Sequence, residues 1–218
     1  MQLTDSLTAV TLLAVGCAIL SLTLLVICLF DVAYFIRAMV SYVLGCWLKK
    51  RLRVTDTAVY SSMCSTTDVD IYLNHMNNAR YLREVDFARI EFCLRTGIWQ
   101  EVRCRGGYMF TIANNIRYRK FVGICNSYVI RTRIVYWDDV SIFFEHRFVS
   151  KSDGFVRAIM HNRQRLTECN VDEVLRSVAG KKKPALALRK PDCPMDIHHW
   201  IQSCLISSAD LKAESQMA

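Results

Sequence analysis

The segment from Asp68 to Asn78 concentrates side chains that could carry out chemistry. It contains two acids, Asp68 and Asp70, together with His75 and three asparagines. A carboxylate can attack a carbonyl carbon or activate a water molecule, and the free amides at a helix start can stabilise a developing negative charge. Together these groups are the components of an acyl-transfer site. The alternative is that the acids and asparagines only cap a helix and turn the chain.

A helix that begins at this segment would hold the amides in place. Asn is a strong N-cap, so we expect the helix to begin near Asn77 or Asn78. Apolar residues then recur at spacings of three and four as far as Phe92, which is the helical period. Gly97 suits the position that follows the last helical residue. The sequence therefore predicts a helix of about 19 residues directly after the acidic segment.

Strands are predicted on both sides of this helix. Residues 54–63 are rich in β-branched side chains, and four later segments share this composition: 108–118, 127–137, 141–149 and 155–166. Turn signals separate the later segments, and short turns make neighbouring strands antiparallel. We expect an α+β fold in which an antiparallel sheet wraps its apolar face around the long helix. Short helices are predicted to follow at residues 171–179 and 197–207.

The N-terminal region is apolar enough for a membrane. Leu7 to Phe30 carries no charge, and as a helix it would reach roughly 36 Å, which exceeds a hydrocarbon core of about 30 Å. We expect a transmembrane anchor. A cleaved signal peptide is the alternative, although residues 1–6 hold no basic side chain and the run is longer than a typical signal.

A second apolar stretch, Val32 to Leu48, could be an interfacial helix or a short second span. The basic segment that follows, Lys49 to Arg53, is expected to face the cytosol. This reading divides the chain into an anchor with its juxtamembrane segment (1–53), a folded domain (54–168) and a C-terminal helical extension (169–218).

Charge and cysteine content limit the partners. The net charge is +8, and residues 1–36 hold no Lys or Arg and two of the 20 acids, so the rest of the chain carries all 28 bases against 18 acids. No nucleic-acid motif occurs, and an anchored protein beside an anionic leaflet explains this charge better. The ten cysteines form no CxxC pair. We expect no nucleic acid, no cofactor and no metal. The adjacent His198 and His199 point in different directions on a helix, so they are poor joint ligands with Cys193 and Cys204.

The segment from Asp70 to Tyr81 resembles the helix-start signature of hotdog-fold thioesterases of the 4-hydroxybenzoyl-CoA thioesterase-like family. In that signature an acid precedes His-[Met/Val]-Asn-Asn-Ala-x-Tyr. The resemblance extends to residues 131–139 and 148–155, and it is strongest over 54–168. It implies a hotdog domain, usually a dimer or a dimer of dimers, that acts on fatty acyl-CoA thioesters.

The resemblance also implies roles for the acidic segment. Asp70 matches the nucleophile or general base, with Asp68 as the second choice. The family usually sets the acid four residues before His and Gly just before it, whereas Asp70 stands five before His75 and Asn74 replaces the Gly. The loop is therefore one residue longer than in the family.

The remaining site residues follow from the same resemblance. His75 and Asn77 would position substrate or water, and the amides up to Asn78 and Ala79 would hold the thioester oxygen. A basic cluster after a predicted strand, Arg117 and Arg119 with Lys120, could contact CoA phosphates. The alternative for this cluster is a solvated sheet edge.

These observations predict a membrane-anchored, homodimeric protein that hydrolyses or binds fatty acyl-CoA at the cytosolic face, at the endoplasmic reticulum. The alternative is a non-catalytic hotdog scaffold that binds acyl chains or partner proteins in lipid metabolism. A third possibility is a secreted protein whose leader is removed.

Overall fold

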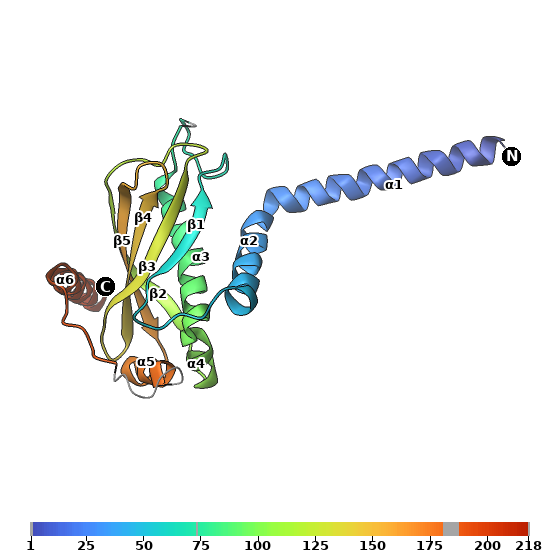
Figure 1. Cartoon of the computed structure of the whole chain (residues 1–218). Coiled ribbons are helices and arrows are strands. Elements are labelled where there is room, and N and C mark those ends of the chain that lie inside the picture. Colours follow the sequence, from blue (N-terminus) through green and yellow to red (C-terminus); the bar gives the residue numbers. More distant parts are fainter. Residues whose placement is uncertain (1, 73, 181–187, 218) are drawn as a thin grey trace. The chain divides into compact units, whose positions relative to one another are not determined.

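The computed structural model describes residues 2–72, 74–180 and 188–217. The chain divides into two compact units, residues 1–41 and 42–218. The second unit contains five strands: β1 (Ala58–Met63), β2 (Met109–Tyr118), β3 (Ser127–Trp137), β4 (Ser141–Ser150) and β5 (Val156–Leu166). Figure 1 shows them as one sheet beside the long helix α3 (Asn78–Thr96). The predicted order of strand, long helix and further strands is confirmed.

The sheet is antiparallel, with the strand order β1-β3-β4-β5-β2. β3, β4 and β5 follow one another through short turns. In the first of these turns Asp138 Oδ1 accepts hydrogen bonds from the amides of Val140 and Ser141, at 2.9 and 2.6 Å. In the second, Gly154 adopts φ 67°, a left-handed conformation that glycine tolerates. β2, which follows α3 in the chain, pairs with the far edge of β5.

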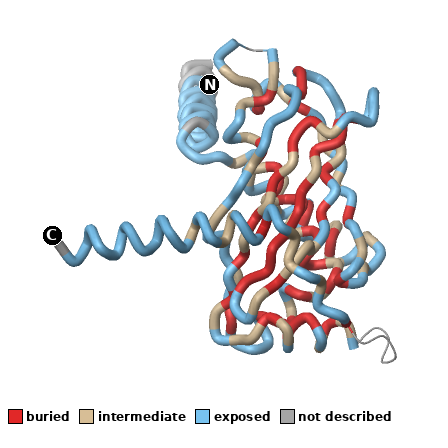
Figure 2. Tube along the Cα trace, turned by 90° about the vertical axis from the view of Figure 1, so that its left-hand side faces the viewer, coloured by how far each residue is buried: buried red, intermediate tan, exposed pale blue. Residues whose placement is uncertain are grey.

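One face of the sheet packs on α3, and the other is turned away from it. Along β3, Ile130 and Thr132 are fully buried, whereas Arg131 and Arg133, which alternate with them, are exposed. Successive side chains of a strand point to opposite faces, so the arginines lie on the face away from α3. Figure 2 shows buried positions concentrated along the strands.

The start and end of α3 agree with the expected helix, which is 19 residues long. Gly97 follows it with φ 94°, and its amide donates to Cys93 O at 3.1 Å. A second helix that the sequence analysis did not predict, α4 (Ile98–Cys104), begins directly after this glycine. The left-handed Gly97 redirects the chain, and burial of Ile98 and Val102 in the core then favours a new helical turn.

Two helices follow the sheet, as expected. In α5 (Val171–Gly180), Asn170 Oδ1 accepts from the amide of Asp172 at 2.9 Å and caps the helix. α6 (Met195–Met217) runs well beyond the predicted end at residue 207, because no Gly or Pro follows to stop it. Near its start, the Trp200 ring lies 6.1 Å from the Phe143 ring of β4, centroid to centroid.

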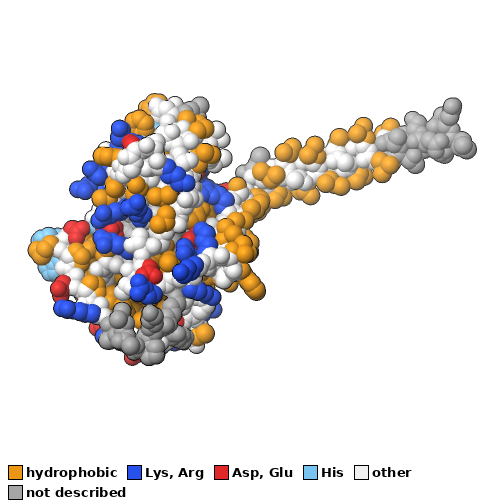
Figure 3. All heavy atoms as spheres, viewed as in Figure 1, with side chains coloured by type: hydrophobic (Ala, Val, Ile, Leu, Met, Phe, Trp, Pro, Cys, Tyr) orange, Lys and Arg blue, Asp and Glu red, His pale blue; other side chains and the backbone are white. Residues whose placement is uncertain are grey.

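The first unit is helical. α1 (Gln2–Leu29) contains a stretch, Val10–Ile27, that is long and apolar enough to cross a membrane and is fully exposed in the structure. Figure 3 shows apolar side chains along its described part. α2 (Val32–Val43) follows, and the chain continues into a π-helical turn, Leu44–Leu48. The expected N-terminal helix is present, and by length and composition it fits either a membrane anchor or a signal sequence.

Candidate active site at the start of α3

Asn77 sets the geometry of the first turn of α3. It adopts an extended conformation, and its side-chain oxygen accepts the amide of Ala79 at 2.9 Å. Its backbone oxygen accepts the amide of Arg80 at 2.9 Å. Among the described residues no acceptor is assigned to the amide of Asn78. The cap therefore occupies the Ala79 amide and leaves the Asn78 amide available to a ligand.

The acidic segment forms a narrow loop that leads into the helix. Val69 bridges Met76, and the Asp70 amide donates to His75 O at 3.0 Å. The amide of Asn77 donates to Asp68 O at 2.8 Å, which closes the loop against the helix start. These backbone bonds bring Asp70 opposite His75 although five residues of sequence separate them.

Asp70 and His75 also meet through their side chains. Oδ2 of Asp70 lies 3.3 Å from Nε2 of His75, and Oδ1 accepts the amide of Tyr72 at 3.2 Å. The other ring nitrogen, Nδ1, is hydrogen-bonded to Oδ1 of Asn74. Both ring nitrogens thus face oxygen atoms, which fixes the plane of the imidazole. Asn74, the residue that departs from the family signature, has a direct part in this arrangement.

Asp68 lies apart from this pair. The residue is 2% exposed, and its carboxylate accepts the amide and the hydroxyl of Ser65 at 2.9 and 2.6 Å. It therefore stabilises the turn that follows β1. Of the two acids considered from the sequence, Asp68 has a structural role and Asp70 faces the histidine.

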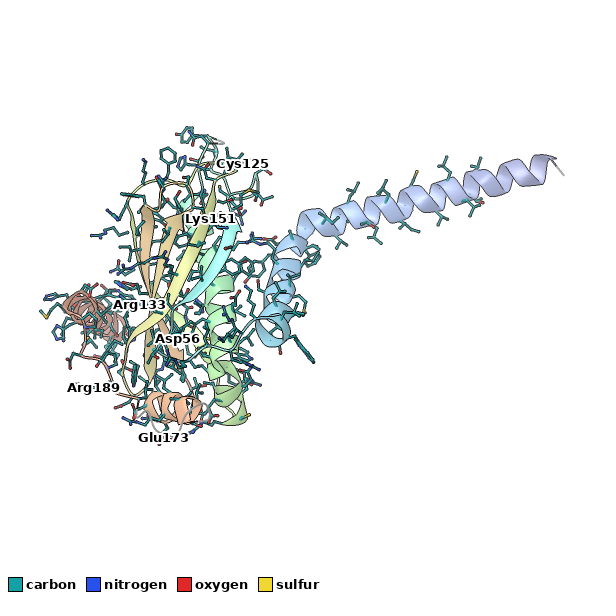
Figure 4. All side chains as sticks on the ribbon, in the orientation of Figure 1. Asp56, Cys125, Arg133, Lys151, Glu173 and Arg189 are labelled. Atoms are coloured by element: carbon teal, nitrogen blue, oxygen red, sulfur yellow. The ribbon has the colours of Figure 1, made fainter. Side chains whose placement is uncertain are left out.

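The β2–β3 loop forms the second wall of the site. His75 bridges Gly123, the Met76 amide donates to Val122 O at 2.8 Å, and the Ile124 amide donates to Asn74 O at 3.2 Å. Figure 4 labels Cys125 in this loop, at the end of the sheet where α3 begins. Two segments far apart in sequence are thereby joined edge to edge.

A pocket of about 230 Å³ lies between these walls. Three of the residues expected from the sequence line it: His75, Asn78 and Arg119. Its other lining residues are Met76, Tyr81, Tyr118, Lys120 and Phe121. The Tyr118 hydroxyl donates to Asn78 O at 2.9 Å, so β2 is tied to the helix start. The expected residues Asp70, Asn77, Ala79 and Arg117 are not among its lining residues. Asp70 contacts the lining residue His75, and Asn77 caps the helix start.

The two arginines of the basic cluster differ. Arg119 donates to Val156 O at 3.3 Å, and its guanidinium lies over the Phe155 ring at 4.6 Å, so it is held at the pocket. Arg117 is exposed on β2, outside the lining. Lys120, which the sequence analysis grouped with them, shares the lining with Arg119.

Tyr81 and Phe121 line the pocket but were not assigned to the site from the sequence. Tyr81 ends the helix-start signature and lies three residues after Asn78, one helical turn along the same face, so the signature itself carried the signal. Burial raises the pKa of Tyr81 to about 12, so its hydroxyl stays protonated at neutral pH. The Phe121 ring lies 5.6 Å from the His75 ring, a contact that no local sequence signal indicates.

The described part of the chain contains no group of three or more His, Cys, Asp and Glu side chains that could hold a metal ion. The pocket lining offers an imidazole, a helix-start amide and two cationic side chains, and the Asp70 carboxylate lies next to the imidazole.

Known proteins are similar to this chain in sequence. Residues 64–201 match the sequence model of the family described as the thioesterase-like superfamily. The chain is 40% identical over 186 residues to Protein THEM6 of Drosophila melanogaster, covering 85% of this chain and 93% of that protein. It is 39% identical over 199 residues to Protein THEM6 of Danio rerio, covering 90% of this chain and 94% of that protein.

A solved structure shows the same fold at low identity. The probable thioesterase YbaW of Escherichia coli superposes with a TM-score of 0.51 at 18% identity, covering 55% of this chain and 94% of that one. At this identity the likeness concerns the fold alone.

Proposed function

The chain belongs to the thioesterase-like superfamily, with its hotdog fold, and from this premise we propose that it is a membrane-anchored protein that binds and hydrolyses fatty acyl-CoA thioesters. The observation that carries this proposal is the arrangement at the helix start. His75, which is paired with Asp70, and Asn78, whose amide is available, line a single pocket.

In the proposed reaction Asp70 is the general base. Its carboxylate lies next to His75, which lines the pocket, and Asp70 takes a proton from water as the water oxygen adds to the thioester carbonyl carbon. The Asn78 amide stabilises the resulting oxyanion, a contribution that is typically on the order of 100-fold in rate. The carbon–sulfur bond then breaks, and coenzyme A leaves as the thiol with the proton from Asp70.

The rest of the pocket suits the other parts of such a substrate. Arg119 and Lys120 are the cationic groups at its rim, and guanidinium and ammonium groups bind phosphate well. Phe121 and Met76 supply apolar surface next to His75. We assign the phosphates of coenzyme A to the basic side and the thioester to the helix start.

Two further parts of the proposal concern assembly and location. The exposed apolar side chains of Ile71 and Tyr72, in the loop that carries Asp70, support a homodimer in which a second copy covers this end of the domain. The apolar α1 and the basic segment Lys49 to Arg53 support an anchor with the domain in the cytosol, at the endoplasmic reticulum.

An assay of the full chain in detergent micelles tests the enzymatic proposal. Free thiol release is measured on saturated acyl-CoAs from short to long chains, for wild type, Asp70→Asn and the control Asp139→Asn. Asp139 is an exposed acid in the β3–β4 turn, so its substitution makes the same change of charge outside the pocket. We expect Asp70→Asn to lower kcat by roughly 100-fold or more, and Asp139→Asn to match wild type.

Other outcomes separate the alternatives. If wild type and Asp70→Asn are equally inactive at every chain length but both bind acyl-CoA, the protein is a non-catalytic hotdog scaffold. If both are equally active, Asp70 is not the base. In either case the catalytic role of the Asp70–His75 pair is abandoned.

A further inference from the structure

The sheet face turned away from α3 carries a cluster of arginines. Arg131 and Arg133 of β3 lie beside Arg147 and Glu145 of β4. With Thr57 and Val59, these four residues line a second pocket of about 440 Å³, which shares no lining residue with the pocket at the start of α3. Its volume is within the usual range for small-ligand sites.

The pairing of the strands places like charges opposite one another. Arg131 stands directly across from Arg147 in the ladder, and Arg133 stands across from Glu145. Like charges at directly opposite positions destabilise a sheet. This pairing would be favourable if an anion lay between the two guanidinium groups.

One carboxylate only partly neutralises the cluster. Glu145 accepts Arg133 Nε at 2.8 Å and Arg147 Nη2 at 3.0 Å, and its side chain is 9% exposed. Burial opposes its ionisation, but contacts with His161, Arg133 and Arg147 outweigh burial and hold the pKa of Glu145 well below its usual range. Among the described residues no acidic partner is assigned to Arg131. Three cations thus share a single permanent anion, which leaves two positive charges uncompensated.

The chemistry of the arginines favours a phosphate as the missing anion. Glu145 accepts one hydrogen bond from Arg133 and one from Arg147, and all three arginines line the pocket. Guanidinium forks match the oxygen spacing of phosphate, and a phosphomonoester carries close to two negative charges at neutral pH. Figure 4 labels Arg133 on the sheet, and Figure 3 shows Lys and Arg atoms gathered over the strands.

We propose that Arg131, Arg133 and Arg147 form a binding site for a dianionic phosphate ester on the outer face of the sheet. This site is independent of the acyl-CoA pocket and does not require that the protein be an enzyme. Two sources share the chemistry, namely a soluble nucleotide that carries a phosphomonoester and the headgroup of a phosphomonoester lipid.

Calorimetric titration of the full chain in non-ionic detergent micelles, at low ionic strength, tests the site with inorganic pyrophosphate. We expect saturable binding to wild type and a loss of at least about tenfold in affinity for Arg131→Gln. The control is Arg165→Gln, which removes an exposed arginine of β5 outside the pocket lining and should change affinity less than about twofold. Arg131 and Arg165 are both exposed. Far-ultraviolet circular dichroism checks that each variant is folded.

Two matched ligand pairs identify the source. Coenzyme A is compared with dephospho-coenzyme A, which lacks the 3′-phosphomonoester, and dioctanoyl phosphatidic acid is compared with dioctanoyl phosphatidylcholine. Wild type should prefer the phosphomonoester in one pair, and Arg131→Gln should lose that preference. Absence of pyrophosphate binding, an equal loss in Arg131→Gln and Arg165→Gln, or no preference in either pair would each overturn the proposal.

Discussion

Nζ of Lys49 lies 2.5 Å from Oε2 of Glu91. The same carboxylate accepts Arg95 Nη1 at 2.9 Å, and Glu91 itself is buried on α3. Nearby, Arg51 Nη1 donates to Leu94 O at 2.7 Å. Lys49 and Arg51 therefore attach the basic segment that precedes β1 to the last turns of α3.

Removal of this carboxylate should weaken the fold. Glu91→Gln leaves Lys49 and Arg95 without their anion, and we expect a loss of about 2 kcal/mol in the free energy of unfolding. Fully buried pairs lose roughly 3–5 kcal/mol, but here both cations reach solvent. Urea denaturation of the full chain in detergent, followed by tryptophan fluorescence, measures the change. Glu214→Gln on the exposed part of α6 is the charge-matched control, and equal midpoints for both variants would contradict the prediction.

A buried histidine predicts pH-dependent stability. Thr132 Oγ1 lies 2.9 Å from Nδ1 of His146, whose ring is fully buried. Burial, followed by the positive charges of Arg89 and His161, lowers the pKa of His146 well below 6.5, and nearby Glu145 only partly opposes them. Below about pH 6.5 the unfolded chain therefore binds more protons than the folded one, and stability should fall as the pH falls.

Thermal unfolding midpoints at pH 7.5 and 5.5 measure this effect. His146→Asn should be less stable overall but should lose less stability between the two pH values, because the buried titrating group is gone. His199→Asn removes an exposed ring on α6 and should keep the wild-type pH dependence. If the midpoint of His146→Asn falls between the two pH values as much as that of wild type, groups other than His146 cause the pH dependence.

The cap of α3 should couple stability to activity. Asn77→Ala removes the acceptor of the Ala79 amide, at an expected cost of about 1 kcal/mol in unfolding free energy. The freed first turn would also misplace the Asn78 amide, so kcat should fall about tenfold or more. Asn77→Asp keeps an accepting oxygen and should retain most of the stability and most of the kcat of wild type. If Asn77→Ala loses stability but keeps wild-type kcat, the Asn78 amide does not serve the reaction.

Arg119 and Arg117 provide a test of how the coenzyme is held. Arg119 lines the pocket and Arg117 does not. We expect Arg119→Gln to raise the KM for acyl-CoA by about tenfold and to leave the KM for the matching acyl-pantetheine, which lacks the nucleotide phosphates, unchanged. Arg117→Gln should behave as wild type on both. Equal effects of the two substitutions would indicate a diffuse attraction by the basic edge.

Features of this structure that depend on residues close together in the sequence were predictable. Asn77 and Gly97 each encode a helix boundary through their own conformational preferences, and both boundaries of α3 were anticipated. The difference between Asp68 and Asp70 was not predictable. Both are acids in the same loop, and the hydrogen bonds of Asp68 to Ser65 and the contact of Asp70 with His75 depend on how that loop folds back on itself.

The pocket also could not be predicted from the sequence. Its second wall comes from residues some forty positions after His75, and the bridge between His75 and Gly123 depends on how β2 pairs with β5. The outer arginine cluster is similar, because Arg131 and Arg147 become neighbours only through the register of β3 and β4. The composition shows that the chain is basic, whereas the pairing of β3 with β4 brings these arginines together in one pocket.

The role of α1 can be decided by combining topology with a charge insertion. If α1 is an anchor, the N-terminal peptide remains in the mature protein, the full chain resists alkaline carbonate extraction, and a C-terminal tag is digested by protease added to intact microsomes. Leu20→Arg with Leu24→Arg should release the protein into the soluble fraction, because each arginine near the centre of a spanning helix costs roughly 2.5–3.5 kcal/mol. The matched Leu20→Ala and Leu24→Ala variant should stay in the membrane. A shortened N-terminus together with a protected tag would instead identify α1 as a cleaved signal, and it would place the thioester site and the arginine site in the lumen, away from cytosolic acyl-CoA.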